Sequence, residues 1–201
     1  MERSNASGRG SSVDESRNVT AALIAFDLHL DGETHIKLLH TEDADAVYKA
    51  TVEERERLRE FMSWADQVID VSDTYRFLRS SERAAFEHTA FAAGIWDGDE
   101  LAGCIDLHNV DWLNMNANIG YWLRERYTGR GIMTRSVQLL TDYAFDALGL
   151  HRIEIRVATA NTRSRRIPER LGFTFEGILQ HVQRLRGEFL DQALYATVRA
   201  D

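Results

Sequence analysis

The sequence predicts an α+β fold in which helices flank a mixed, mostly antiparallel central sheet. The antiparallel part is indicated by two turn signals, Asp31-Gly32 and Asp97-Gly98, each of which joins two strand-like segments. One parallel pair is indicated by a helix-like segment near position 140 that lies between two strand-like segments. Parallel neighbours need such a crossover, whereas a hairpin can only join antiparallel strands.

Composition limits the class of protein. The chain has 201 residues, 44% of them hydrophobic, so one domain can bury a core of ordinary size. We expect a flexible polar tail over residues 1–19 and a single domain over residues 20–201. The one cysteine, Cys104, excludes an intramolecular disulfide, and no apolar run reaches membrane-spanning length, so a cytoplasmic protein without a membrane partner is expected. The net charge of −8 argues against nucleic acid as a partner.

The first half of the chain is predicted to contain both strands and helices. The first hairpin turn is flanked by strands over residues 20–30 and 35–40, and residues 41–62 have a charged helical pattern. Ser72 and Asp73 are typical of the N-cap of a second helix, which we expect to end near Glu87. Three strands then follow, over residues 88–96, 100–110 and 116–123.

In the second half, apolar residues at helical spacing predict a helix over residues 131–148, with a stop at Gly149. A short helix is expected to open after Asn161. The remaining segments are predicted strands, over residues 152–158, 173–182 and 189–198.

The stretch "RERYTGRG" stands where the strand ending at residue 123 gives way to the helix. The first turn of a helix has backbone N–H groups without partners, and the helix dipole adds partial positive charge there. Gly129 and Gly131 have no Cβ atoms to hold a phosphate away from these N–H groups, and Arg126 and Arg130 can add charge-assisted contacts. The sequence therefore predicts a phosphate site; an ordinary glycine-containing connection is the alternative.

Several separated motifs resemble the GNAT N-acetyltransferases, specifically the RimJ/RimL-type branch that modifies protein N-termini. They are "IGYWL", the R-x-x-G-x-G stretch from Arg126 to Gly131, the Asn161-x-x-Ser164 step and "ERLGFTFEG". The resemblance is close from Leu101 onward and looser over residues 33–100. It implies a GNAT fold with a splayed parallel strand pair, and transfer of acetyl from acetyl-CoA to a primary amine. The first expectation for the acceptor is the N-terminal α-amino group of a protein or peptide.

The resemblance also implies how the coenzyme is held. The diphosphate would rest on the N–H groups of residues 129–134, and the pantetheine arm would pair with the strand that carries Tyr121, Trp122 and Leu123. The implied coenzyme-binding residues are Tyr121, Trp122, Leu123, Arg126, Gly129, Arg130, Gly131, Ile132, Met133, Thr134, Asn161 and Ser164. No metal is expected, because the histidines form no compact ligand set.

Ser164 is the implied catalytic acid. Many GNAT enzymes protonate the departing thiolate with a tyrosine, but Pro168 stands at that position, and Ser164 lies one turn earlier. For Ser164 and Asn161 the alternative is a helix cap. Pro168 falls inside the expected helix and cannot bond the carbonyl of Ser164, so we hypothesise that this carbonyl is freed, or the turn kinked, beside the thiol. Simple tolerance of proline in a short helix is the alternative.

The sequence offers two candidates for the general base and does not decide between them. Relatives of this type often have glutamate where Asn118 stands, and an amide cannot serve as a base. Asp106 and His108 point the same way from their strand by period-two alternation, so either is a candidate, with a structural histidine as the alternative. The residues expected to bind the acceptor are Trp64, His108, His181 and Gln183. His181 and Gln183 share a face of the next-to-last strand by the same alternation, and for Trp64 a buried core position is the alternative.

Parts of the sequence fit three other functions. The stretch "GRGIMT" matches a dinucleotide fingerprint only in part, because Thr134 replaces its third glycine and repeated β-α-β units are absent. A catalytically silent coenzyme-binding domain would explain Asn118. An enzyme that acetylates or succinylates a small amine or a peptide antibiotic would keep the same scaffold. Homodimers are common among such proteins, so a homodimer is a further expectation.

Overall fold

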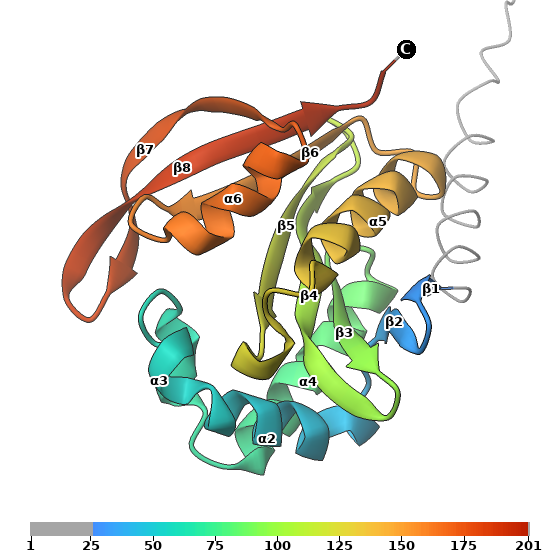
Figure 1. The fold of residues 1–201 in the computed structure, drawn as a ribbon, viewed down its shortest axis with the longest axis vertical. Coiled ribbons are helices and arrows are strands. Elements are labelled where there is room, and N and C mark those ends of the chain that lie inside the picture. The colour runs from blue at the N-terminus through green and yellow to red at the C-terminus, as the bar shows by residue number, and fades with distance from the viewer. Residues whose placement is uncertain (1–25, 201) are drawn as a thin grey trace, which may run out of the picture.

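The computed structural model describes residues 26–200 (Figure 1). The expected polar tail and the first residues of the first expected strand lie outside this range. The eight strands form one sheet in the order β1-β2-β3-β4-β5-β6-β8-β7. Only β5 and β6 pair in parallel. The predicted mixed, mostly antiparallel sheet with one parallel pair is therefore confirmed.

The strands are β1 (Asp27–Asp31), β2 (Thr34–Leu38), β3 (Phe91–Asp97), β4 (Glu100–Asp111), β5 (Asn116–Leu123), β6 (Arg152–Ala158), β7 (Thr174–Leu185) and β8 (Glu188–Val198). The α-helices are α2 (Ala44–Glu53), α3 (Arg55–Leu58), α4 (Val71–Phe86), α5 (Ile132–Asp146) and α6 (Thr162–Arg170). Three 3₁₀ turns are η1 (Thr41–Asp43), η2 (Ser63–Gln67) and η3 (Glu125–Tyr127). Within residues 26–200, no helix has the length and apolar character needed to cross a membrane.

Helices cover both faces of the sheet (Figure 1). Because side chains alternate along a strand, β4 contributes Ile105 to one core, where α5 packs with Val137. On the opposite face Cys104 packs against a smaller core, to which α2 contributes Val47 and α4 contributes Leu78. Helix α5 and the helices α2 and α4 therefore lie on opposite faces of the sheet.

The expected helix over residues 41–62 is broken into η1, α2 and α3, and the chain leaves helix after Leu58. Glu54 has φ −101° and ψ 4°, which ends α2 and redirects the chain. In α3 only Leu58 is buried, so no apolar stripe holds a longer helix against the sheet. The break is functionally important because it places Arg57 and the following loop beside the end of β5.

The N-cap of α4 is Asp70, so the prediction of Ser72 and Asp73 was wrong by two residues. Asp70 Oδ1 accepts a hydrogen bond from the Ser72 N–H at 2.7 Å, and Asp73 Oδ2 accepts from the Asp70 N–H at 3.1 Å. This reciprocal pair is a capping box formed by two aspartates. The D-x-x-D spacing of Asp70 and Asp73 is the sequence signal for this capping box.

Candidate active site

Strands β5 and β6 lose contact halfway along their length. They pair only where Asn116–Asn118 faces Arg152–Glu154, although β5 continues to Leu123. Beyond this point β6 stays paired with β8 on its other side. The two parallel strands therefore diverge and leave an open edge on β5, which is the splay that the resemblance implied.

The backbone groups that face the gap follow from the strand register. The N–H of Arg124 donates to the carbonyl of Ala102 at 2.8 Å, so Arg124 is bonded toward β4. Residues of an antiparallel strand alternate between the two sides, so the amides of Ile119, Tyr121 and Leu123 are directed toward the gap. The carbonyl of Leu123 accepts a hydrogen bond from the Arg57 guanidinium, which confirms that this side of the strand is open.

A helix N-terminus lies beside this open edge. Gly129 and Gly131 have φ 78° and 74°, the left-handed region that glycine adopts at little cost. Gly131 is the N-cap of α5, and no side chain caps the helix there. The N–H of Arg135 makes the first helical bond, to Gly131 at 3.1 Å, so those of residues 132–134 belong to the unpaired first turn. A Cβ atom at Gly129 would have no neighbour within 4 Å, so the backbone conformation, rather than crowding, requires this glycine.

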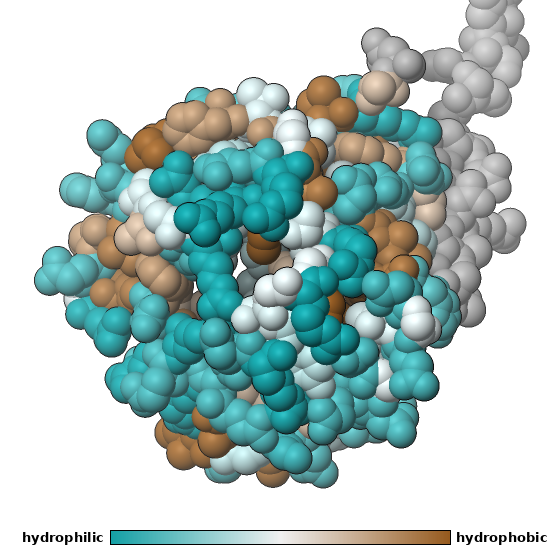
Figure 2. All heavy atoms as spheres, viewed as in Figure 1, coloured by the Kyte–Doolittle hydropathy of each residue, from teal (hydrophilic) through white to brown (hydrophobic). Residues whose placement is uncertain are grey.

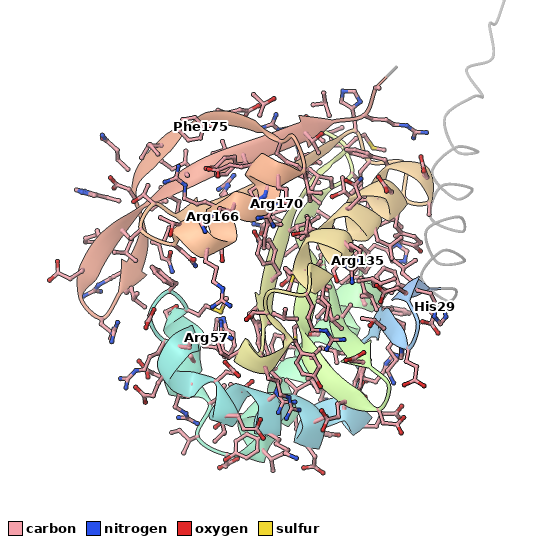
Figure 3. All side chains as sticks on the ribbon, in the orientation of Figure 1. His29, Arg57, Arg135, Arg166, Arg170 and Phe175 are labelled. Carbon is pink, nitrogen blue, oxygen red and sulfur yellow. The ribbon has the colours of Figure 1, made fainter. Side chains whose placement is uncertain are left out.

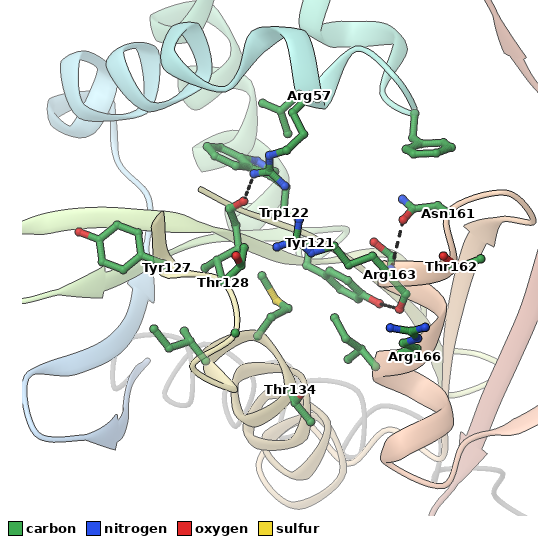
Figure 4. A pocket seen from close by; sticks show the side chains of 18 of the residues that line it. Arg57, Tyr121, Trp122, Tyr127, Thr128, Thr134, Asn161, Thr162, Arg163 and Arg166 are labelled. Carbon is green, nitrogen blue, oxygen red and sulfur yellow. Dashed lines mark hydrogen bonds between the residues drawn. The ribbon is translucent and has the colours of Figure 1, made fainter. Parts of the chain in front are cut away.

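The open edge and the helix start line one cavity of about 830 Å³ (Figure 4). Figure 2 shows a hollow near the centre of a largely hydrophilic face, and Figure 3 shows Arg57 and Arg166 on either side of it. The predicted residues that line the cavity are Tyr121, Trp122, Leu123, Gly129, Gly131, Ile132, Met133, Thr134, Asn161 and Ser164. Ten residues that the sequence pointed to separately are thus brought into one site.

Arg126 and Arg130 do not line this cavity. Arg126 pairs with Glu100 at 2.6 Å, and Arg130 pairs with Asp97 at 3.0 Å. Both guanidinium groups also lie near the ring of Tyr127, at 5.1 and 5.6 Å from its centroid. In the structure the two arginines tie the glycine stretch to the β3–β4 turn, so their predicted role as phosphate ligands stays a prediction.

The cations that do line the cavity are Arg57, from α3, and Arg163, Arg166 and Arg170, from α6. Arg163 is paired with Glu125 at 3.1 Å, and its hydrogen bond is the main cause of the lowered pKa of Glu125. Arg166 and Arg170 have no carboxylate partner within 4.0 Å among residues 26–200. Sequence reasoning missed both, although their i, i+4 spacing just after Ser164 was a usable signal.

Asn161 and Ser164 form the wall opposite β5. The Asn161 side chain caps α6, because its Oδ1 accepts from the Ser164 N–H at 3.1 Å. Helix α6 continues through the buried Pro168, and the Ser164 carbonyl accepts a hydrogen bond from the Tyr121 hydroxyl at 2.9 Å. The carbonyl that proline leaves without a helical donor is therefore bonded to a side chain of β5.

Asp106 and His108 lie on the face of the sheet opposite α5, near the point where β5 and β6 part. His108 Nδ1 is 2.5 Å from Asp106 Oδ1. Asp106 is opposite Gly120 in the register, and a Cβ atom on Gly120 would stand 2.9 Å from its carboxylate. Asn118, which pairs with His108 on one side and Glu154 on the other, is buried. Neither Asp106 nor His108 lines the cavity.

None of the predicted acceptor residues, Trp64, His108, His181 and Gln183, lines the cavity. The Trp64 ring lies 6.4 Å from that of Trp122, which lines the cavity. Gln183 donates to the Phe61 carbonyl at 2.7 Å. His181 has φ 54° inside an irregular stretch of β7, so the expected alternation with Gln183 does not hold, and its exposed ring lies near Phe189.

Cys104 is not positioned as a nucleophile. Burial raises the pKa of its thiol well above the usual range, which keeps it protonated. Among residues 26–200, no group of three or more His, Cys, Asp or Glu side chains could hold a metal ion.

Comparison with known proteins agrees with this geometry. Residues 35–174 match the family described as "Acetyltransferase (GNAT) domain". YdaF of Bacillus subtilis is 32% identical over 168 residues, which cover 83% of this chain and 91% of YdaF. The "Ribosomal-protein-serine acetyltransferase" of Escherichia coli is 28% identical over 174 residues, 87% of this chain and 93% of that protein. The solved structure of the microcin C7 self-immunity acetyltransferase MccE, in complex with acetyl-CoA and AMP, has a TM-score of 0.83 at 26% identity, covering 89% and 99% of the two chains.

The chain therefore belongs to the acetyltransferase (GNAT) family. Within it, the protein is an acetyl-CoA-dependent N-acetyltransferase with relatives named for ribosomal-protein acetylation.

Proposed function

We propose that the protein acetylates the N-terminal α-amino group of a protein or peptide. The observation that carries the proposal is the single cavity in which the open edge of β5 meets the uncapped start of α5. The open edge of β5 can pair with an extended arm, and the uncapped start of α5 can bind a diphosphate. The name of the E. coli relative supports a protein acceptor, whereas the similarity to MccE favours the alternative of a small amine or peptide antibiotic.

In this proposal the acetyl-CoA molecule spans the cavity. Its diphosphate rests on the N–H groups of residues 129–134, with Arg166 and Arg170 supplying positive charge from the α6 side. Its pantetheine arm lies along the edge of residues 121–123. The thioester then lies in the gap between β5 and α6, beside Ser164.

The transfer needs three groups of the protein. The amine nitrogen attacks the thioester carbon, a C–N bond forms, and the N–H of Leu123 donates to the developing oxyanion. The C–S bond then breaks, and the Ser164 hydroxyl gives its proton to the departing thiolate. A base takes the proton released by the amine, and solvent returns a proton to Ser164. An α-amino group has a pKa of about 8 in model compounds, so a weak base is enough.

The Asp106–His108 pair is the proposed base. The contact to Asp106 holds His108 Nδ1, which leaves Nε2 free to accept a proton, directly or through a water molecule. The pair stands where β5 and β6 part, beside Asn118, the position at which relatives often carry glutamate.

His108→Gln is expected to lower kcat about a hundredfold, the lower end of what a positioned general base contributes. The affinity for coenzyme A, measured by titration calorimetry, should stay within about twofold, because His108 lies outside the donor cavity. The matched control is His151→Gln, at an exposed histidine immediately before β6. An unchanged kcat in His108→Gln would show that this histidine is structural and is not the base.

The acceptor is proposed to enter through a second cavity of about 390 Å³. It lies between the loop after α3 and the β7–β8 hairpin, and it shares Glu60, Phe61 and Ala160 with the donor cavity. Gln183 holds the Phe61 carbonyl, so its contribution to the acceptor site is indirect. A cavity of this size accommodates one or two residues of a peptide rather than a folded domain.

Removing the two unpaired arginines should weaken donor binding. Arg166→Ala/Arg170→Ala is expected to raise the Kd for coenzyme A about tenfold at low salt, because each phosphate contact is charge-assisted. The difference from wild type should shrink as the salt concentration rises, since exposed charges are screened. The control Arg79→Ala/Arg184→Ala removes two exposed arginines outside both cavities. Equal losses in the two double variants would contradict a role in donor binding.

One experiment separates the acceptor classes. Purified protein and labelled acetyl-CoA are incubated with a library of peptides, with small amines and with a cell extract, and the products are analysed by mass spectrometry. Label on N-terminal α-amino groups supports the proposal. Label only on small molecules or on lysine side chains contradicts it, and no release of free thiol with any acceptor would indicate a silent coenzyme-binding domain. The cytoplasmic location, the homodimer and the use of acetyl rather than succinyl donors stay predictions.

A further inference from the structure

A hydrogen bond crosses the donor gap between β5 and α6. The Tyr121 hydroxyl, on β5, donates to the carbonyl of Ser164, on α6, at 2.9 Å (Figure 4). These two residues are 43 positions apart in the chain. In an ordinary helix the Ser164 carbonyl would accept from the N–H four residues later, but Pro168 has none. The carbonyl is therefore available to a donor from outside the helix.

The gap needs such a connection because the sheet does not provide one there. Beyond Asn118 and Glu154 the two strands share no hydrogen bonds, and α6 follows β6 away from β5. Among residues 26–200, the other hydrogen-bonded link from the end of β5 to the start of α6 is the exposed ion pair of Glu125 and Arg163. An exposed ion pair contributes little, whereas the Tyr121–Ser164 hydrogen bond is partly buried and so is screened less by water.

We propose that Tyr121 is a positioning residue that sets the distance of Ser164 from the open edge of β5. Its hydroxyl takes the place of the helical donor that Pro168 removes, so the turn carrying Ser164 is held by the strand opposite and not only by its own helix. Burial raises the pKa of Tyr121 far above the usual value, so the hydroxyl keeps its proton and remains a donor. The inference rests on the proposed function, because it concerns the residue assigned as the acid.

The test is a cycle of Tyr121→Phe and Ser164→Ala, with kcat and the Kd for coenzyme A measured for each protein. Tyr121→Phe should lower kcat about tenfold, because a displacement of 1 Å at a reacting group can cost about a hundredfold. Its Kd should change less than threefold, because the first turn of α5 is untouched. In the Ser164→Ala background the same change should have no further effect on kcat, since Tyr121 acts through Ser164. The control is Tyr48→Phe, whose hydroxyl donates to the Ile69 carbonyl at 3.1 Å outside both cavities.

Pro168→Ala distinguishes two roles of the Tyr121 hydroxyl: positioning Ser164, and only satisfying the Ser164 carbonyl with a hydrogen bond. Added to Tyr121→Phe, it returns an N–H that can bond the Ser164 carbonyl within α6, so the thermal midpoint should recover. The kcat should remain about tenfold low, because no bond crosses the gap. Recovery of kcat together with the midpoint, wild-type kcat in Tyr121→Phe, or additive losses in the cycle would each overturn the inference. Failure of the wild-type protein to release thiol with any acceptor would instead overturn the proposed function.

Discussion

Gly129→Asp is expected to weaken coenzyme A binding about a hundredfold, because two unit charges 4 Å apart near a protein surface repel by up to about 4 kcal/mol before screening. A side chain at this position has open space, since a Cβ atom there would meet no atom within 4 Å. Gly129 lines the donor cavity, so the added carboxylate would stand beside the uncapped start of α5. It would compete with the diphosphate for the same N–H groups.

Gly129→Asp should change the stability of the protein far less than its affinity for coenzyme A. Aspartate tolerates the left-handed backbone at φ 78° better than most residues, and a negative charge near a helix N-terminus is favourable. We therefore expect the thermal midpoint to change by no more than about 3 °C. Gly129→Asn, which has the same shape without the charge, is the matched control and should retain affinity within about fivefold. Equal Kd values for the aspartate and asparagine variants would show that no anion binds at this corner.

Removing the Ser164 hydroxyl is expected to lower kcat about a hundredfold, at the lower end of the contribution of a positioned general acid. Alanine leaves the backbone untouched, so the Asn161 cap on the Ser164 N–H and the Tyr121 bond to the Ser164 carbonyl both persist. The Kd for coenzyme A should therefore stay within about twofold. The measurement is release of free thiol under saturating acceptor, beside calorimetry for the donor.

Ser81→Ala is the control for this change. Its hydroxyl also lies on a helix and donates to the Phe77 carbonyl at 3.0 Å, but it is exposed on α4, outside both cavities. Near-wild-type kcat in Ser81→Ala, with a large loss in Ser164→Ala, supports the acid. A kcat for Ser164→Ala within about threefold of wild type would leave only the helix-cap interpretation.

Local signals predicted most of the fold. Turn signals and period-two alternation identified the strands, because each depends on a few neighbouring residues. The extent of the helices after β2 was not predictable in the same way. The break at Glu54 reflects what α2 and α3 can bury against the sheet, and burial is a tertiary property. The charged pattern over residues 41–62 continues through the break and gives no sign of it.

The candidate site was predictable where its chemistry lies in the backbone. Gly129 and Gly131 indicate a left-handed turn before a helix, so their conformation could be predicted from the sequence. The partners of long side chains cannot be predicted in this way. Arg126 and Arg130 lie next to the glycines in the chain but pair with carboxylates from the β3–β4 turn, whereas Arg166 and Arg170 come from a helix more than thirty positions later. Which arginine reaches the cavity depends on how α6 packs beside α5.

We propose that the uncapped first turn of α5 binds the diphosphate of the acetyl donor. A crystal structure of the protein with coenzyme A tests it most directly. We expect diphosphate oxygens within hydrogen-bond distance of N–H groups of residues 129–134, and the pantetheine arm along residues 121–123 of β5. Coenzyme bound with its diphosphate elsewhere, for example on Arg126 and Arg130 at the β3–β4 turn, would contradict it.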